Sequence, residues 1–186
     1  MSDVLKSHFL FPRNVGDAAE PSFTGRGGSF VCGATARFSI QIDESHNISD
    51  AKFRAAGCEV LIATLSLFTE RIQAISTADA AVIGQNPEKF LEEFAIDDDK
   101  HHCVRLACDA LLAAIREYSD AARSEWNGDE ALICTCFFVS EKTIEREIKL
   151  GRLTSVQDVT RACSAGGGCG SCQPLIVEIL ENLNGV

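Results

Sequence analysis

Two cysteine pairs in the last third of the chain constrain its fold more than any other feature. The segment "ICTCF" carries Cys134 and Cys136 as C-x-C, and "GGGCGSCQP" carries Cys169 and Cys172 as C-x-x-C. Glycines this dense lose much backbone entropy on folding, so an ordered site must offset the cost. Four thiolates on two short arms suit a tetrahedral zinc ion or a [2Fe–2S] cluster.

The spacing of the two arms favours the cluster over zinc. Zinc ribbons carry C-x-x-C on both arms with a shorter gap than 137–168. The glycines let backbone N–H groups approach anionic sulfides, and a helix beginning near Pro174 directs its dipole toward that charge. Structural zinc on the same four cysteines is the alternative. A redox-active dithiol is disfavoured because no βαβ pattern surrounds the C-x-x-C.

The composition limits the class of protein. With 46% hydrophobic residues, the 186-residue chain can bury a core in one ordinary domain or two small ones. We find no membrane span and no secretory signal, and expect a cytoplasmic protein without a membrane partner. A net charge of −10 argues against nucleic acid as a partner. Nine cysteines in a reducing compartment indicate metal binding or redox chemistry.

The first part of the chain predicts an α+β fold. Alternating apolar and polar residues predict strands over 36–43 and 48–57. Longer apolar patterns predict helices that begin after Cys58, cover 87–94 and run from about 101 to 118. Strands followed by helices indicate α+β architecture, and the domain is assigned to residues 1–120.

The second part predicts a small, all-helical domain over residues 132–186, after a polar linker at 121–131 that contains a turn-forming Asn-Gly. Ser140 caps a helix that ends at Gly151, and Thr154 with Gln157 matches a capping box. Pro174 suits the first turn of a last helix. So small a helical unit buries little apolar surface, and a metal centre would stabilise it.

Residues 132–182 resemble the [2Fe–2S] domain of bacterioferritin-associated ferredoxin and the central domain of NifU. The C-x-C, the GGGCGSC and the predicted helical sequence between them all match. This resemblance implies that Cys134, Cys136, Cys169 and Cys172 hold a permanent [2Fe–2S] cluster. Cys163 precedes Cys169 by six residues and is expected in the core, where cysteine is often buried.

Three further cysteines stand at loops or helix starts: Cys32 in "VCGA", Cys58 in "AAGCEV" and Cys103 in "DDDKHHCV". Three thiols and an imidazole make a Cys₃His set, which suits zinc or an iron–sulfur centre. From spacing alone, isolated buried cysteines are the better interpretation, because the three positions are far apart in the chain.

A second resemblance changes this interpretation. The segments "FPRNVGDA", "VCGA", "DAKFRAAGC" and "HHC" are similar to the iron–sulfur scaffold IscU and the N-terminal domain of NifU, over residues 9–118. The similarity implies a three-stranded sheet packed on helices. It also implies that Cys32, Cys58 and Cys103 receive a labile [2Fe–2S] cluster or iron, with zinc as a substitute. His102 is the expected fourth ligand and His101 the runner-up, while Cys108 packs in a helix core.

The sequence departs from this family at two places. The family has aspartate two residues after its first cysteine, where this chain has Ala34. That change suggests a more firmly held cluster or a different route of transfer. The Leu-Pro-Pro motif read by an Hsp70 chaperone is replaced by "AIDDDKHHC". The chain also ends before the third domain of full NifU, so we expect a two-domain, truncated NifU.

The leading interpretation is an iron–sulfur assembly scaffold, not an enzyme. The resemblance implies a cysteine desulfurase, recipient apo iron–sulfur proteins, an electron donor and a second copy of the chain as partners. The alternative is a [2Fe–2S] electron carrier or redox sensor with a repurposed scaffold domain. A zinc-binding interaction module is a third reading. A cysteine hydrolase is discounted because no oxyanion motif accompanies Cys103.

Overall fold

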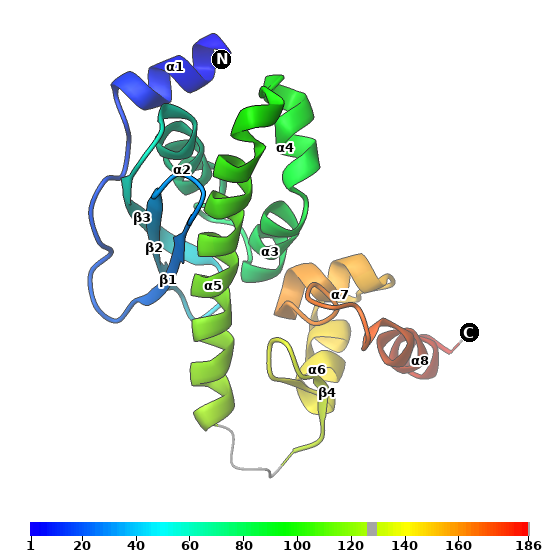
Figure 1. Ribbon diagram of the computed structural model, residues 1–186. Helices are drawn as coiled ribbons and strands as arrows, with labels where there is room; N and C mark the ends of the chain where they lie inside the picture. The colour runs from blue at the N-terminus through cyan, green and yellow to red at the C-terminus, as the bar shows by residue number, and fades with distance from the viewer. Residues whose placement is uncertain (126–129, 186) are drawn as a thin grey trace.

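The structure is a computed structural model that describes residues 1–125 and 130–185. The first part contains eight helices and strands and one short 3₁₀ turn (Figure 1). In chain order these elements are α1 Asp3–Leu10, β1 Phe23–Gly28, β2 Thr35–Ile42, β3 Ile48–Ala56, α2 Glu59–Arg71, α3 Thr77–Gln85, α4 Pro87–Phe94, η1 Asp98–Lys100 and α5 His101–Glu125.

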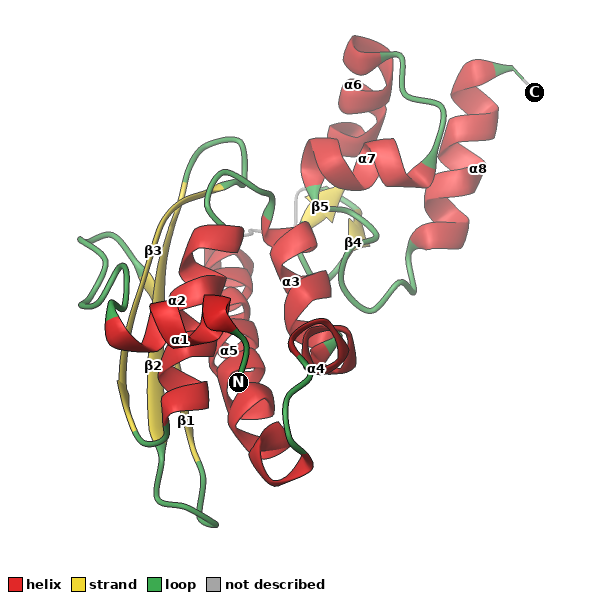
Figure 2. Cartoon of the chain, turned by 90° about the horizontal axis from the view of Figure 1, so that it is seen from above, coloured by secondary structure: helices red, strands yellow, loops and turns green. Residues whose placement is uncertain are grey.

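An antiparallel sheet of order β1-β2-β3 forms the centre of this part, with the helices on one of its faces (Figure 2). Helix α5 crosses β1 at very close range. A Cβ on Gly25 would lie 1.9 Å from the carbonyl oxygen of Ala110. Glycine at this position therefore lets the helix and strand backbones meet.

The core lies between the sheet and the helices. The buried face of the sheet contributes Phe38 and Phe53, which are cross-strand neighbours in the register of β2 and β3. Phe68 and Leu65 of α2 and Leu111 of α5 are fully buried against them. This α+β architecture confirms the predicted fold class.

Several predicted elements are found where the sequence placed them, and some were missed. Strands β2 and β3 and helix α4 match their predicted ranges. Helix α5 continues to Glu125, seven residues beyond its predicted end at 118, so it covers the first five residues of the expected linker at 121–131. The Asn-Gly turn expected at 127–128 lies outside the described residues. Strand β1 is half glycine, with Gly25, Gly27 and Gly28, and gave no alternation to read.

The second part holds five elements, and these are β4 Leu132–Cys134, β5 Val139–Ser140, α6 Glu141–Gly151, α7 Val156–Cys163 and α8 Gln173–Asn184. It is helical as predicted, with a small two-stranded sheet in addition. The hairpin forms because the C-x-C arm turns back on itself, pairing Cys134 with Val139.

The capping predictions for these helices are partly confirmed. The Ser140 hydroxyl accepts a hydrogen bond from the Thr143 backbone N–H at 3.2 Å, so it caps α6 as expected. The capping box of α7 is shifted by one residue. Ser155, not Thr154, accepts from the Asp158 N–H at 3.2 Å, and the Ser155 hydroxyl donates to the Asp158 carboxylate at 2.6 Å.

The two parts meet where α7 and the glycine-rich loop pack against α3 (Figure 1). A Cβ on Gly167 would lie 2.3 Å from the Cβ of Ala78, and the hydroxyls of Thr77 and Ser164 are 3.3 Å apart in a buried position. This contact fixes the second part on the first. Within the described residues, no helix has both the length and the apolar character needed to cross a bilayer.

Candidate functional site

The three N-terminal cysteines come together at one end of the sheet. Cys32 is exposed in the loop between β1 and β2, Cys58 stands at the N-cap of α2, and Cys103 is buried in the first turn of α5. The Sγ atoms of Cys58 and Cys103 lie 2.6 Å apart, and both residues are free thiols. The long separations in sequence are therefore closed by the fold.

The two neighbouring histidines occupy different surroundings. The Nε2 atom of His102 lies 3.4 Å from the Sγ of Cys103, and the same imidazole is near enough to Cys32 to help lower the pKa of that thiol. His101 instead places its Nε2 at 3.0 Å from the carbonyl oxygen of Ile96. Of the two, His102 is the one that faces the cysteines.

The thiols at this site differ in acidity. Hydrogen bonds from the Ser29 hydroxyl and then the Ala34 backbone lower the pKa of Cys32 to about 7, and His102 adds to the effect. Burial, and then contact with Cys58, raises the pKa of Cys103 to about 12. Cys32 is thus the exposed and more acidic thiol of the site, and Cys103 the buried and less acidic one.

Ala34, which stands where the resembling family has aspartate, is buried at the end of the sheet. A Cβ built on Gly57 would lie 2.6 Å from the Cβ of Ala34, and Gly57 has a left-handed φ of +147°. The side chain at position 34 therefore points into a tight backbone crossing beside Cys58. A carboxylate here would be desolvated unless it faced a cation.

The four C-terminal cysteines line one small cavity of about 90 Å³. Cys134 and Cys172 are its buried members, whereas Cys169 is exposed. The Sγ atoms of Cys136 and Cys169 lie 3.4 Å apart, and Cys134 hydrogen-bonds Cys172. The hairpin and the start of α8 thus supply two thiols each to one space.

The glycines around Cys169 meet specific backbone demands. Gly166 and Gly170 have φ values of +88° and +77°, a region that other residues rarely adopt. A Cβ on Gly168 would lie 2.7 Å from the Cβ of Cys136. The glycine-rich run therefore lets the loop close over the C-x-C arm.

Serine hydroxyls are functional neighbours that the sequence did not single out. The Ser171 hydroxyl, 3.1 Å from Cys169, is the main cause that lowers the pKa of this thiol to about 7. Ser29 does the same for Cys32. A serine two or three residues from a loop cysteine was the available signal. Burial raises the pKa of Cys172 to about 12, so this site also pairs an acidic thiol with a buried one.

Two cysteines predicted to be structural are indeed core residues. Cys108 and Cys163 are both buried, and burial raises the pKa of each thiol, to about 12 and about 11. Across residues 1–125 and 130–185, no three His, Cys, Asp or Glu side chains stand in a geometry that would already hold a metal ion.

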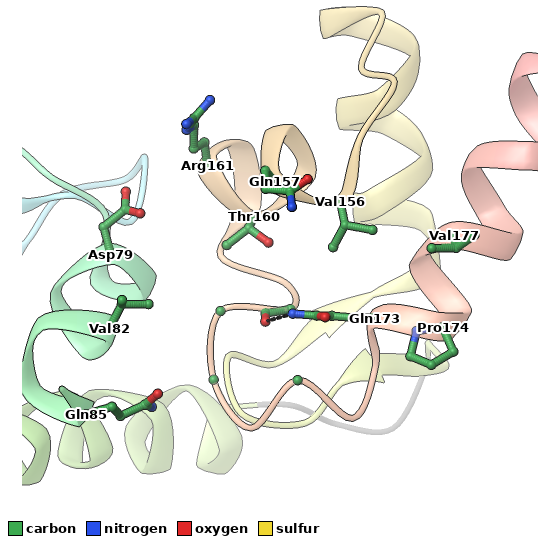
Figure 3. A pocket seen from close by; sticks show the side chains of 14 residues that line it. Asp79, Val82, Gln85, Val156, Gln157, Thr160, Arg161, Gln173, Pro174 and Val177 are labelled. Atoms are coloured by element: carbon green, nitrogen blue, oxygen red, sulfur yellow. Dashed lines mark hydrogen bonds between the residues drawn. The ribbon is translucent and has the colours of Figure 1, made fainter.

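A larger groove of about 750 Å³ lies between the two parts and borders the C-terminal cysteine cavity, with which it shares Gly168 and Gly170 (Figure 3). Asp79 and Val82 of α3 form one wall, and Thr160 and Arg161 of α7 face them. The Gln173 amide donates to the carbonyl of Gly166 at 3.0 Å and so supports the glycine-rich loop from α8.

Comparison with known families assigns the chain to a family. Residues 1–125 match the NifU-like N terminal domain, and residues 132–182 match the BFD-like [2Fe-2S] binding domain. The first match covers more than half of the chain, so the protein belongs to the NifU-like family. Both matched ranges agree with the resemblances drawn from the sequence.

Individual relatives give the same assignment. The chain is 35% identical to the nitrogen fixation protein NifU of Trichormus azollae over 98% of its own length and 63% of that protein. It is 40% identical to the iron-sulfur cluster assembly scaffold protein IscU of Azotobacter vinelandii, over 63% of this chain and 92% of that one. The chain therefore spans under two thirds of the length of the NifU relatives.

Solved structures confirm the fold of the first part. A NifU-like N-terminal protein from Brucella abortus superposes with a TM-score of 0.53 at 16% identity, over 64% of this chain and 94% of that one. A putative scaffold protein for the SUF system from Fervidobacterium islandicum gives 0.52 at 18% identity, over 61% and 95%.

Proposed function

We propose that the protein is an iron–sulfur cluster assembly scaffold that builds a labile cluster on Cys32, Cys58 and Cys103, with His102 as the fourth ligand. The observation that carries this proposal is the convergence of these four side chains at one end of the sheet. Iron and sulfide are cargo here. The scaffold itself performs no catalytic turnover.

The acidity of Cys32 supports a role as the first sulfur acceptor. A thiolate at neutral pH attacks the outer sulfur of a persulfide on a cysteine desulfurase. A new S–S bond then forms between Cys32 and the outer sulfur, and the cysteine of the desulfurase leaves as a thiolate. Cys58 and Cys103 stand behind it as thiols that lose their protons when iron binds.

The second part fits a resident [2Fe–2S] cluster. Four cysteines around one 90 Å³ cavity give each iron two thiolates, and the glycine-rich loop leaves the backbone free to approach the sulfides. Cys134, Cys136, Cys169 and Cys172 would hold the group. Bound there, it would supply one-electron transfer during assembly or release.

The proposed partners are a cysteine desulfurase, recipient apo iron–sulfur proteins, an electron donor and a second copy of the chain. The proposed location is the cytoplasm. A second candidate function is a [2Fe–2S] electron carrier or redox sensor, which Ala34 favours because the family's aspartate is absent from the N-terminal site.

Anaerobic loading with iron and sulfide tests the proposal. The wild type should bind two clusters, one removed by mild chelation and one resistant. The Cys32→Ala/Cys58→Ala/Cys103→Ala variant should keep only the resistant cluster, and Cys134→Ala/Cys136→Ala only the labile one. Loss of both clusters in either variant, with the fold intact by circular dichroism, would contradict two independent sites.

A further inference from the structure

Three arginines form a single row across the sheet. The strand register places Arg26 opposite Arg37, and Arg37 opposite Arg54, so all three side chains leave the same face. Gly25 and Gly27, the residues on either side of Arg26, lie against α5 instead. Because the helices cover one face of the sheet (Figure 2), the arginine row lies on the opposite face.

This row carries more positive charge than the protein neutralises. Like charges directly opposite each other on neighbouring strands repel. The Asp17 carboxylate lies 3.2 Å from Nη1 of Arg37 and 2.7 Å from Nε of Arg54. Among the described residues, it is the carboxylate that forms ion pairs with these two arginines. The Nε atom of Arg37 is buried without a hydrogen-bond partner. Three guanidinium groups thus share one carboxylate in a chain whose net charge is −10.

The arginine row borders a hollow of about 540 Å³. Small residues border the hollow on the next cross-strand row toward the sheet end, where Thr35 and Ala56 stand in register. The same end of the sheet leads directly into the loop of Cys32 and to Cys58. A molecule held in the hollow would therefore lie beside the cluster-assembly residues.

We infer that this hollow is a docking site for an acidic segment of a partner protein, with aspartate or glutamate side chains paired to the arginine row. Guanidinium groups bind carboxylates through paired N–H donors, and clusters of arginines commonly bind acidic motifs. Neighbouring strand backbones lie about 4.8 Å apart. The row therefore presents three guanidinium groups side by side, which suits several carboxylates on one segment better than one small anion.

The overall charge favours a protein segment over nucleic acid. A polyanion longer than the hollow would meet the acidic remainder of the surface, whereas a short acidic segment need not. The docking itself is independent of cluster chemistry. Only its consequence, that the partner is brought to Cys32, rests on the proposed scaffold function.

Fluorescence anisotropy of a labelled hexaglutamate peptide on the iron-free chain at low salt tests this inference. The Arg26→Gln/Arg37→Gln/Arg54→Gln variant should bind about tenfold more weakly than the wild type, as expected for the loss of several exposed ion pairs. A matched variant, Lys142→Gln/Arg146→Gln/Lys149→Gln on α6, removes the same charge elsewhere and should bind as the wild type does. Replacing all three row arginines by lysine should retain most of the binding.

Equal weakening in both glutamine variants would overturn the inference, since it would show a general charge effect. Tighter binding of a single-stranded oligonucleotide, or equal competition by inorganic phosphate, would also overturn it. Loading of the row variant with inorganic iron and sulfide needs no partner and should match the wild type. A chain that binds the peptide but builds no labile cluster would contradict the proposed function alone.

Discussion

The Sγ atom of Cys58, at the start of α2, lies 2.6 Å from the Sγ atom of Cys103, at the start of α5. This contact joins residues that are 45 positions apart and brings two helix starts to one end of the sheet. Cys32 reaches the same place from the loop between β1 and β2, and it alone is fully exposed among the three. The site is therefore open on the side of its most acidic thiol.

The acidity of Cys32 predicts selective alkylation of the iron-free chain. Because its pKa is lowered to about 7, the thiolate forms as pH rises through neutrality, and the rate with iodoacetamide should rise over the same range. Cys103, buried and with its pKa raised to about 12, should react far more slowly. Peptide mapping by mass spectrometry follows each residue separately.

Ser29→Ala provides the control for this prediction, since the Ser29 hydroxyl is the main cause of the lowered pKa. The midpoint for Cys32 should then move to higher pH, while the rate at Cys169, whose partner is Ser171, stays unchanged. A Cys32 midpoint that does not respond to this change would show that Ser29 has no such role.

The two histidines should behave differently when replaced. His102→Ala removes the imidazole that faces Cys32 and Cys103, so the labile cluster should be lost or strongly weakened. His101→Ala removes contacts with the Ile96 carbonyl and the Asp98 carboxylate and should leave the cluster in place. The chelator-sensitive absorbance of the loaded chains measures this. The reverse pattern would assign the fourth ligand to His101.

The glycine-rich loop should tolerate no side chain at Gly168. Its Cβ would lie 2.7 Å from the Cβ of Cys136, and overpacking of this kind costs about 1–3 kcal/mol. We expect Gly168→Ala to lower the thermal midpoint of the loaded protein and to release the resistant cluster more readily.

Gly185→Ala is the matched control for this prediction, since no atom lies within 4 Å of a Cβ there. It has a positive φ of +71°, so it tests backbone strain without crowding. Equal effects of the two changes on the cluster would contradict a specific role for the contact with Cys136.

Restoring the family's aspartate with Ala34→Asp should make the labile cluster easier to transfer and the fold less stable. The side chain would enter the crossing of Gly57 beside Cys58, where burying a polar group costs about 1–3 kcal/mol. Urea denaturation and the rate of cluster loss measure the two effects. Ala34→Asn, of similar size but uncharged, should destabilise without speeding transfer.

Much of the fold could be predicted from local patterns, because strands β2 and β3 show clear alternation and helix α4 begins at Pro87, a residue that suits the first turn. The missed strand β1 is glycine-rich for a reason that only tertiary structure shows, since Gly25 must admit the backbone of α5. The hairpin of the C-x-C arm is equally short of signal. It is made by a single turn between Cys134 and Val139.

The candidate site was less accessible to sequence reasoning from spacing alone. Cys32, Cys58 and Cys103 are far apart in the chain, and their meeting depends on the sheet end and two helix starts. Family resemblance supplied that link. The arginine row had no sequence signal either, because Arg26, Arg37 and Arg54 align only through strand register.

Transfer of the cluster tests the central claim most directly. The iron-free chain and the Cys32→Ala/Cys58→Ala/Cys103→Ala variant are loaded with iron and with sulfur from a cysteine desulfurase. Each is then mixed with an apo-ferredoxin whose own spectrum reports the arrival of a cluster. The scaffold account predicts rapid transfer from the wild type and none from the variant, with the resistant cluster left in both. Equal transfer from both proteins, or none from either, would contradict it.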